Sequence, residues 1–542
     1  MNASPVRFRL PWPNLLSLLL LSAMGFAWYR APHDLDYCWQ IRTGQRILAT
    51  GEVRQPDSFS FTIAGKDIPD HEWLYESILA VVWNNLGYAG LKFTRMFLYA
   101  APVAILGWQL HNRGVRPHAI AVVVVCCLFV LLFFERLRPL ICTTIGLQLV
   151  AGWLQHHVHG RRPLDWKLPL TMLLWGNLHP AIIIGQALLL GAVGWHVAET
   201  AIRPAARRID PSRLRTLILW GGIGLLTSLL TPAPVDRLLY PFSSELRHPA
   251  QRMFEEIKSP FRHLGHPPYV VEMLFALAIF FAVILWLRRR ELFAWEWALF
   301  AGVIGLFLIA IRSAGDFLMI GSLLAVPQIG QLLLSGVRSP RWRNLARPLV
   351  KCDNEFKRIL NSPLFKLQPI WPAIGFTAIA LVSLWPWGDR VPNKELPDWP
   401  REAADWIAAG GLSGAGPWNV FSGYNEGSYL IWRFDGHVKV YSDTRGFYYP
   451  GDLLDDSFSL PRARGDWQAH LNRVLDRGAE FFLLPVRGTD GVRFQLWNML
   501  EPHVSQPLYL DNKYVILSAS QVRDAAKSIS DGQPDRRNRN QN

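Results

Sequence analysis

The chain has 542 residues, of which 50% are hydrophobic and 18% charged, and its formal net charge is +14. This length alone would suggest two to four soluble domains. The apolar residues, however, are concentrated in long uncharged runs of membrane-spanning length, which exclude an ordinary soluble protein. The positive charge is typical of a polytopic membrane protein with basic cytoplasmic loops, so no nucleic-acid partner is expected.

About eleven transmembrane helices are predicted from these runs. The first, Leu15–Phe26, follows two arginines and is expected to be an uncleaved anchor with its N-terminus inside. The other ten are expected near 88–110, 118–134, 139–156, 168–178, 181–199, 214–231, 269–287, 293–311, 316–335 and 369–387. The span 168–178 is short and polar at its end, so a broken or re-entrant helix is the alternative there.

The basic loops orient these spans. When the spans alternate from an inside N-terminus, every compact basic cluster falls on the inside, including the long loop 336–368. The loops 30–87 and 232–268 then lie outside, together with everything after Pro386.

The character of the chain changes after residue 387. Apolar runs become short, as in Val438–Tyr441 and Phe481–Pro485, and Gly, Asp and Pro separate them. This pattern predicts an extracytoplasmic α/β soluble domain at 388–523. The polar stretch 524–542 is expected to be a disordered tail. The predicted fold is therefore an α-helical polytopic membrane protein (1–387) with a C-terminal α/β domain.

Two carboxylates, Asp34 and Asp36, come directly after the first span. They open a predicted helix that runs to about Thr50 and ends at Gly51. One interpretation is that an aspartate caps this helix. The other is that the pair accepts a proton or binds a metal ion or a sugar hydroxyl at the membrane surface.

A second polar segment follows within the same loop. Residues 56–62 are expected to form a short strand, and Asp70, His71 and Glu72 precede an amphipathic helix from Tyr75 to Gly87. These three residue types serve as metal ligands and in proton transfer. The alternative is that Asp70 caps the helix and that Glu72 lies in its first turn.

Other candidate residues lie at the same predicted face. Arg136 and Arg138 stand at a membrane edge and either snorkel to the interface or hold a lipid phosphate. Asn177 and His179 interrupt an apolar segment, where they either line a cavity or make an interhelical hydrogen bond. Glu256, in the loop 232–268, either belongs to a solvated face or contributes to the site.

Several motifs resemble those of bacterial polytopic proteins related to the GT-C glycosyltransferases. The stretch from Asp34 to Gly44 resembles the family's "DPDLWWHLRTG"-type opening. Further similar motifs are Pro56–Thr62, Asp70–Leu74, Arg138-Pro139, Trp175–His179, Glu256 with Ser259-Pro260, Gly427–Trp432 and Tyr441–Arg445. The chain departs from the family at Gln40, which stands in place of a histidine, at Pro180 and at Ser428.

The resemblance implies a glycosyltransferase that takes a sugar from a polyprenyl-phosphate donor at the extracytoplasmic face and passes it to a cell-envelope acceptor. Asp36, or else Asp34, would be the base. Arg136 and Arg138 would hold the donor phosphate. The Asp70-His71-Glu72 segment would shape the acceptor site or a site for a divalent metal ion.

The same resemblance implies a protein integral to the bacterial cytoplasmic membrane, with a cytoplasmic N-terminus and with membrane lipids and the lipid-linked donor as partners. Two alternatives remain open. One is a transporter or a scaffold for envelope assembly. The other is a GT-C relative that has lost catalysis and retains glycolipid binding, for which Gln40 is the main argument.

Overall fold

The computed structural model describes residues 35–68, 70–133, 137–202, 209–239, 258–265, 269–338, 400–487 and 494–532, with a few positions between 344 and 355. The chain forms two compact units. Unit 1 comprises 1–31, 88–234 and 254–387, and unit 2 comprises 32–87, 235–253 and 388–542. The first and last predicted spans, Leu15–Phe26 and 369–387, lie outside the described residues.

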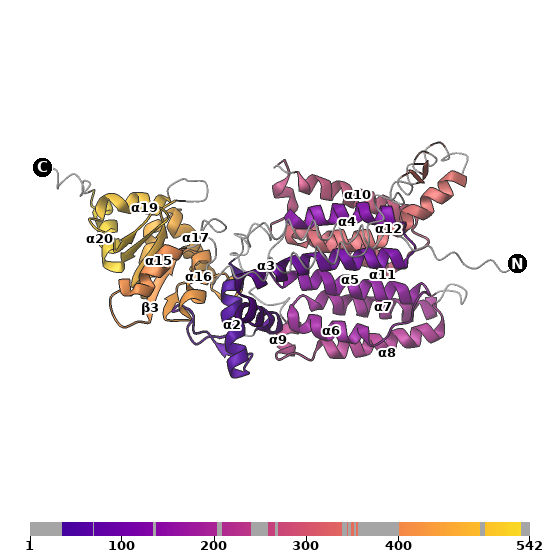
Figure 1. The fold of residues 1–542 in the computed structure, drawn as a ribbon, viewed down its shortest axis with the longest axis horizontal. Helices are drawn as coiled ribbons and strands as arrows, with labels where there is room; N and C mark the ends of the chain where they lie inside the picture. The colour runs from indigo at the N-terminus through magenta and orange to yellow at the C-terminus, as the bar shows by residue number, and fades with distance from the viewer. Residues whose placement is uncertain are drawn as a thin grey trace. The chain divides into compact units, whose positions relative to one another are not determined.

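Unit 1 is helical. Its helices include the part of α3 (Trp73–Asn112) that follows Gly87, which breaks α3 with a φ of 56°. The others are α4 (Pro117–Phe133), α5 (Leu140–Val158), α6 (Lys167–Leu178), α7 (Ile182–Ile202), α8 (Pro211–Ser228), α10 (Val270–Leu287), α11 (Ala294–Ile309) and α12 (Ala314–Arg338). Figure 1 shows these helices running alongside one another. Each coincides with a predicted span to within a few residues.

The number of membrane crossings is a separate question. Within the described ranges, three helices are long and apolar enough to cross a membrane: Trp73–Asn112, Ile182–Ile202 and Val270–Leu287. The apolar stretches Ala119–Leu128 and Ala294–Ile309 are shorter. The structure therefore supports an integral membrane protein and does not confirm the predicted count of eleven.

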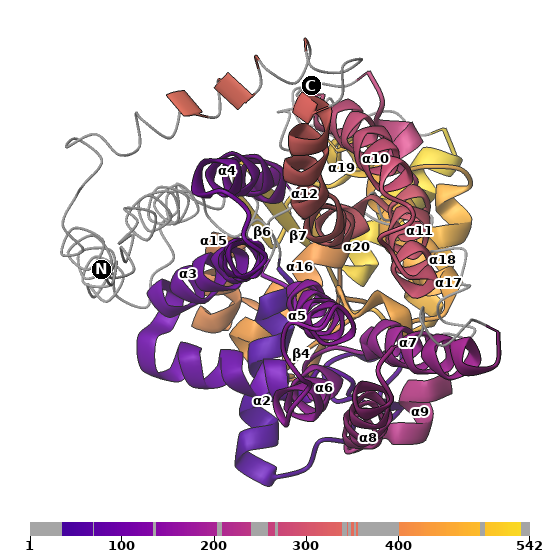
Figure 2. The same cartoon turned by 90° about the vertical axis from the view of Figure 1, so that its right-hand side faces the viewer.

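Helix α5 is the most enclosed helix of unit 1. It packs against α6, α7, α8 and α12 and lies among the other helices in the end-on view of Figure 2. Close packing is possible because small residues face large ones: a Cβ atom at Gly146 or Gly185 would lie about 2.5 Å from the ring of Trp175. The indole of Trp175 fills the space that these two glycines leave.

Unit 2 contains a mixed five-stranded sheet with the order β4-β3-β5-β7-β6. Its strands are β3 (Trp418–Ser422), β4 (Val438–Val440), β5 (Phe481–Pro485), β6 (Tyr509–Leu510) and β7 (Tyr514–Ser518). Strand β3 pairs in parallel with β4 and β5, whereas β5 with β7 and β7 with β6 are antiparallel. The helices are α15 (Arg401–Trp406), α16 (Tyr424–Phe434), α17 (Gly451–Ser459), α18 (Trp467–Asp476), α19 (Gln495–Leu500) and α20 (Ala519–Ser530). The predicted α/β character is confirmed, and the short apolar runs Val438–Tyr441 and Phe481–Pro485 contain β4 and β5.

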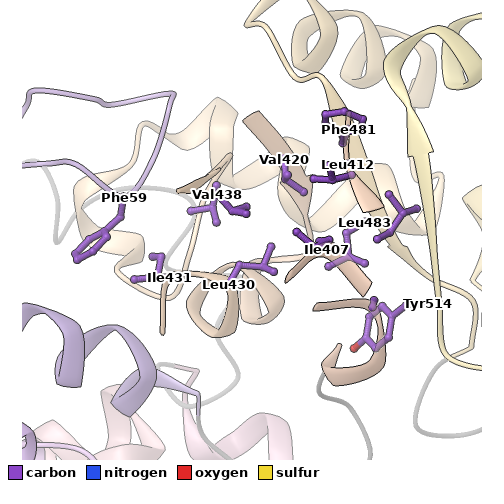
Figure 3. Packing of buried hydrophobic residues seen from close by; sticks show 13 residues of the cluster. Phe59, Ile407, Leu412, Val420, Leu430, Ile431, Val438, Phe481, Leu483 and Tyr514 are labelled. Atoms are coloured by element: carbon purple, nitrogen blue, oxygen red, sulfur yellow. The ribbon is translucent and has the colours of Figure 1, made fainter. Parts of the chain in front are cut away.

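The N-terminal part of unit 2 consists of α2 (Asp36–Thr50), the two-residue strands β1 (Gln55–Pro56) and β2 (Asp67–Ile68), and α3 up to Gly87. The predicted strand 56–62 does not form as a continuous strand: β1 ends at Pro56, and only Ser60 makes an isolated parallel bridge, to Val440 of β4. The amide of Val440 donates to the carbonyl of Phe59 (3.0 Å), and that of Phe61 donates to the carbonyl of Val440 (3.2 Å). Figure 3 shows Phe59 beside Ile431 and Val438 in the hydrophobic core of the sheet. The loop 30–87, expected as an outer loop of the membrane region, thus contributes to the core of the C-terminal domain.

The prediction of a disordered tail at 524–542 is wrong for its first residues. Residues 524–530 belong to α20, which begins with a capping box between Ser518 and Gln521. Val522 and Ala525 are buried. Val522 and Ala525 are three residues apart and therefore lie on one helical face. The polar residues around them gave the segment the composition of a disordered tail. Residues 533–542 lie outside the described part.

Candidate functional site

Helix α2 presents the first predicted acid. Asp36 is its first residue and is 8% exposed, while the N-cap position is Leu35, which makes no side-chain capping bond. Gly51 ends the helix in the left-handed conformation, with a φ of 74°, as predicted. Asp36 is therefore not the N-cap residue, and its place in the first turn suits a carboxylate because of the helix dipole. Asp34 lies outside the described residues.

A glycine brings α2 against the start of α3. A Cβ atom at Gly44 would lie 2.1 Å from the carbonyl oxygen of Glu76, so no larger residue fits without movement. On the same helix, Gln40 donates from Nε2 to Oε2 of Glu72 (3.4 Å). Because Asp36 and Gln40 are four residues apart, they share one face of α2, the face that reaches the Asp70-His71-Glu72 segment.

The Asp70-His71-Glu72 segment forms a turn before α3. Asp70 Oδ1 accepts from the amide of Glu72 (2.8 Å) in a local turn. Because α3 begins at Trp73, Asp70 is not its N-cap residue and Glu72 is not in its first turn, so the capping alternative is wrong. The carboxyl of Asp70 is also hydrogen-bonded to that of Glu76, so one of the two keeps its proton. Oδ2 of Asp70 and Oε2 of Glu76 are buried and have no hydrogen-bond partner among the residues that the structure describes. Two buried acceptors are therefore left for a ligand or a water molecule.

Burial shifts the pKa values of Asp70 and His71 in this segment. Desolvation raises the pKa of Asp70, although hydrogen bonds from Glu76 and the Glu72 amide and the charge of Arg237 oppose that rise. Desolvation, with a smaller contribution from Arg237, lowers the pKa of His71 to about 4. His71 is therefore neutral at pH 7. Arg237, on α9 (Pro234–Leu239), donates from Nη2 to the carbonyl of His71 (2.7 Å).

A small cavity of about 50 Å³ adjoins these acids. Asp70 and Glu76 line it together with Trp39, Asp57 and Arg445. This volume accommodates one or two water molecules or a single hydroxyl group, but not a sugar ring.

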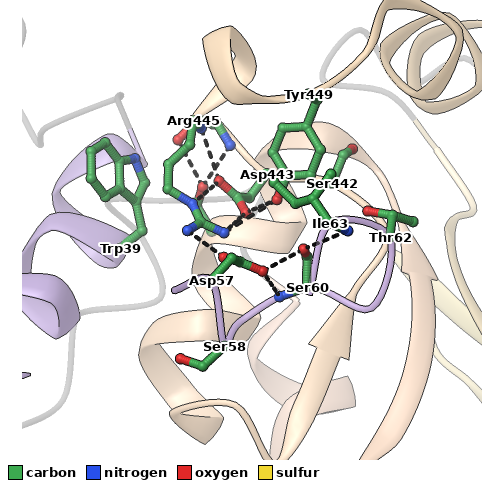
Figure 4. Close-up of polar contacts among 12 residues, drawn as sticks. Trp39, Asp57, Ser58, Ser60, Thr62, Ile63, Ser442, Asp443, Arg445 and Tyr449 are labelled. Atoms are coloured by element: carbon green, nitrogen blue, oxygen red, sulfur yellow. Dashed lines mark hydrogen bonds and ion pairs between the residues drawn. The ribbon is translucent and has the colours of Figure 1, made fainter. Parts of the chain in front are cut away.

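Figure 4 shows a closed ion network. Two of its members, Asp57 and Arg445, line the cavity. Arg445 donates from Nε (2.9 Å) and Nη2 (2.7 Å) to the two oxygens of Asp443, and from Nη1 to Oδ1 of Asp57 (2.7 Å). Oδ2 of Asp57 accepts from the amide and hydroxyl of Ser60, and Tyr449 donates its hydroxyl to Asp443. The Pro56–Thr62 and Tyr441–Arg445 motifs are thus joined directly by a buried ion pair.

Two more motif segments meet in unit 2. Helix α16, which carries Gly427–Trp432, packs against α2, and Arg42 Nε donates to the carbonyl of Trp432 (2.8 Å). A Cβ atom at Gly427 would lie 2.1 Å from the carbonyl of Ser442. Glycine at this position therefore permits the close approach of α16 to the segment that follows β4.

The remaining predicted residues that are described lie in unit 1. Trp175 donates to the hydroxyl of Thr143 (3.1 Å), which is also 2.7 Å from Nδ1 of His179. Asn177 donates to the carbonyls of Leu173 (2.9 Å) and Leu230 (3.0 Å), the second of which is the interhelical bond expected as one alternative. Arg138 lies in the turn before α5 and is partly exposed. Arg136 and Glu256 lie outside the described residues.

No group of three or more metal-ligand side chains forms a candidate metal site in the described ranges. Sequence reasoning did not select Glu76, Arg237, Asp57 or Arg445 as site residues. Asp57 and Arg445 lie in two segments that resemble motifs of the GT-C family. Their opposite charges were the one feature of the sequence that could have suggested an ion pair between these segments. Glu76 looked like an ordinary acid in the first turn of a helix.

Comparison with known proteins finds similarity in structure only. No protein-family model and no curated protein sequence matches the chain. The oligosaccharyltransferase of Archaeoglobus fulgidus is similar in two crystal structures. One is tethered to an acceptor peptide that contains the NVT sequon (TM-score 0.52, 10% identity, covering 88% of this chain and 70% of that chain). The other is its apo form (TM-score 0.53, 10% identity, 88% and 69%).

A third similar structure is the archaeal oligosaccharyltransferase AglB of the same organism, in complex with an inhibitory peptide and a dolichol-phosphate (TM-score 0.50, 10% identity, covering 86% of this chain and 69% of that chain). At this level of identity the likeness concerns the fold and not the activity. The chain shares the fold of these oligosaccharyltransferases, which agrees with the GT-C resemblance of its sequence motifs.

Proposed function

We propose that the chain is a glycosyltransferase that moves a sugar from a polyprenyl-phosphate-linked donor to a cell-envelope acceptor, at the extracytoplasmic face of the bacterial cytoplasmic membrane. The GT-C-like fold supports the reaction class. The structurally similar oligosaccharyltransferase AglB was solved in complex with a dolichol-phosphate. By analogy with that complex, we propose a lipid-linked donor for this chain.

The observation that carries the proposal is the position of three acids, Asp36 at the start of α2 and the Asp70–Glu76 pair at the start of α3. Asp36 lies in the first turn of α2, and the Asp70–Glu76 pair keeps two buried oxygens without a partner in the described structure. Oxygens of this kind bind hydroxyl groups, which are the chemical groups that a sugar acceptor presents. A purely structural cluster would have satisfied them, as the neighbouring Arg445 network does.

The proposed chemistry uses Asp36 as the base, with Asp34 as the alternative. The acceptor hydroxyl passes its proton to the carboxylate while its oxygen bonds to the anomeric carbon of the donor. The bond between that carbon and the phosphate oxygen breaks, and the phosphate leaves with the electron pair. Because a phosphate needs no strong general acid, positive charge near it is the main stabilising factor.

Arg136 and Arg138 are proposed to supply that charge, since a guanidinium fork matches two phosphate oxygens. If they do, Arg138→Lys should lose nearly as much transfer activity as Arg138→Ala, because an ammonium group cannot replace the fork. Transfer rates at saturating and limiting donor would show this. Full activity of the lysine variant would instead favour a snorkelling role for Arg138.

The remaining predicted residues have secondary roles in this proposal. Asp70, His71 and Glu72, with Gln40 bonded to Glu72, shape the acceptor side. His179 and Glu256 are proposed for substrate contacts from unit 1. Asn177 is proposed to hold α6 to the end of α8 through the carbonyl of Leu230, which positions His179 two residues further on.

The direct test is a transfer assay with the full chain in liposomes. Undecaprenyl-phosphate carrying radiolabelled mannose, glucose or arabinose is supplied together with an envelope extract, and both free undecaprenyl phosphate and labelled acceptor are measured. The proposal expects at least one donor to be consumed in proportion to acceptor labelling. If correctly folded protein binds these donors and consumes none, the non-catalytic glycolipid-binding alternative replaces the proposal.

A further inference from the structure

A second cavity lies wholly within unit 1, among α4, α10 and α12. Its volume is about 560 Å³, within the usual range of roughly 300–1,000 Å³ for small-molecule sites. Most of its lining is apolar, for example Val122, Leu277, Phe280 and Val326. The charged residues among the described lining side chains are two arginines, Arg113 and Arg116, and no acid lines it. The cavity therefore combines an apolar body with a cationic portion.

Arg113 hydrogen-bonds to a carbonyl group of α12 that has no donor within its own helix. Pro327 lacks an amide hydrogen, so the carbonyl of Leu323, one turn earlier, loses its helical donor. Nη1 of Arg113 supplies that missing donor at 2.8 Å. The other donor atoms, Nε and Nη2, are buried and have no hydrogen-bond partner within the described structure. Buried guanidinium donors without an acceptor are costly, which indicates a missing anionic partner.

Glu296 interacts electrostatically with Arg113 but does not supply that partner. Its carboxylate accepts from Nε2 of Gln155 (2.7 Å), Nε2 of His159 (3.1 Å) and the amide of Phe293 (2.8 Å). No ion pair joins Glu296 to Arg113 among the described contacts, and Arg161 adds further positive charge near Arg113.

The backbone next to Arg113 also favours an anion. Helix α3 ends with the amide of Val115 bonded to the carbonyl of Leu110 and that of Gly114 bonded to the carbonyl of His111, with Gly114 at a φ of 75°. Helix α4 starts two residues later, at Pro117. Its free N-terminal amides and helix dipole therefore add to the positive potential beside Arg116.

We propose that this cavity binds an anionic membrane glycerophospholipid, with its phosphate on Arg113 and an acyl chain against α4, α10 and α12. Free phosphate would leave the apolar body of the cavity unfilled, and a neutral lipid would leave the guanidinium donors unpaired. The inference does not depend on the proposed transferase activity, because none of the acids proposed for transfer lines this cavity.

Gly330 permits a test that does not weaken the fold. It lies in α12, lines the cavity, and has no atom within 4 Å of the position that a Cβ would occupy. Leucine is a better helix former than glycine by roughly 1 kcal/mol. Gly330→Leu should therefore place a side chain in the space that the lipid would occupy without lowering the melting temperature. Arg113→Gln removes the fork but also weakens the bond to Leu323, so it needs this second variant beside it.

The experiment titrates the purified full chain in mild detergent with dioleoylphosphatidylglycerol, with dioleoylglycerol, which has the same acyl chains but no phosphate, or with undecaprenyl phosphate, and counts bound lipid by native mass spectrometry. Charge-assisted bonds from Arg113 to a phosphate should favour phosphatidylglycerol over dioleoylglycerol by about tenfold. Arg113→Gln should remove this preference, and Gly330→Leu should remove the bound lipid. Arg290→Gln, which changes an exposed arginine after α10 that does not line the cavity, should behave as the wild type.

Three results would overturn the proposal. Equal retention of phosphatidylglycerol and dioleoylglycerol would mean that bulk lipid fills an apolar crevice. Stronger retention of undecaprenyl phosphate, abolished by Gly330→Leu, would make the carrier lipid the occupant. Unchanged binding in a correctly folded Gly330→Leu variant would place the lipid elsewhere on the protein.

Discussion

Units 1 and 2 each contain an arginine with buried guanidinium nitrogens, but the two arginines use their hydrogen-bond donors differently. In unit 2, the guanidinium of Arg445 donates to Asp57 and Asp443, and Tyr449 completes the network. In unit 1, Arg113 donates to one backbone carbonyl, and two of its buried nitrogens have no described partner. A network that satisfies its own groups fixes structure, whereas one that leaves donors unpaired indicates a ligand.

The same contrast separates the acids of unit 2. Asp57 and Asp443 are fully engaged, and they join the Pro56–Thr62 segment to the segment after β4. Asp70 and Glu76 hydrogen-bond to each other and keep one buried oxygen each for another partner. We therefore assign the first pair to stability and the second to the acceptor site.

The largest expected effect comes from opening the closed network. Arg445→Met should lower the free energy of unfolding by about 3–5 kcal/mol, because it leaves Asp57 and Asp443 buried without a cation. Chemical unfolding of the full chain in detergent measures this loss. The matched control is Arg54→Gln, which removes ion pairs to Asp67 and Asp236. Because the Arg54 side chain is 55% exposed, solvent screens these pairs and their loss should cost far less than the loss of Arg445. Equal losses in both variants would remove the distinction between closed and exposed networks.

The next prediction concerns His71 and pH. Its pKa of about 4 in the folded chain lies below the ordinary value of 6.5, so only the unfolded chain binds this proton between these two pH values. The wild type should therefore lose up to about 3 kcal/mol of stability relative to His71→Gln as the pH falls from 6.5 to 4, and nothing further above 6.5. Melting temperatures of both proteins across this range provide the measurement. The raised pKa of Asp70 acts in the opposite direction but is common to both proteins. A constant difference between them would show that His71 is not buried as described.

A smaller effect is expected from the contact between α2 and α3. Gly44→Ala places a methyl group where the carbonyl of Glu76 lies and should cost about 1–3 kcal/mol. Because that contact positions Glu76, the variant should also lower transfer activity. Gly191→Ala in α7, where a Cβ meets no atom within 4 Å, should leave stability unchanged or raise it by up to about 1 kcal/mol. A Gly44→Ala variant as stable as the wild type would contradict this packing.

The sequence predicts best what is determined locally. Gly51 and Gly87 were expected to end their helices, and both have positive φ angles that glycine adopts at little cost. The helices of unit 1 followed from apolar run length, and β4 and β5 from short apolar segments between turn residues. These signals lie within a few residues of the feature that they predict.

Contacts between distant segments could not be predicted in the same way. Phe59 joins a core whose other members begin at Ala403, and Asp57 pairs with Arg445, 388 residues later in the chain. The period of the Pro56–Thr62 segment indicates a strand but does not identify its neighbour. The same holds for the Asp70–Glu76 pair and for the bond from Arg237 to His71. Both depend on the conformation of the turn before α3, which the spacing of these residues in the sequence does not determine.

The central claim is that Asp36, in the first turn of α2, takes part in sugar transfer. Asp36→Asn keeps the size of the side chain and an acceptor oxygen but cannot take a proton, so its structural cost should stay near or below about 1 kcal/mol. The most direct measurement is the rate of transfer from labelled undecaprenyl-phosphate sugar, per folded protein, for the wild type, Asp36→Asn and the surface control Asp67→Asn. We predict a loss of roughly 10²–10⁴-fold for Asp36→Asn and none for Asp67→Asn. A rate within about twofold of the wild type for folded Asp36→Asn would contradict the claim and move the role of base to Asp34 or Asp70.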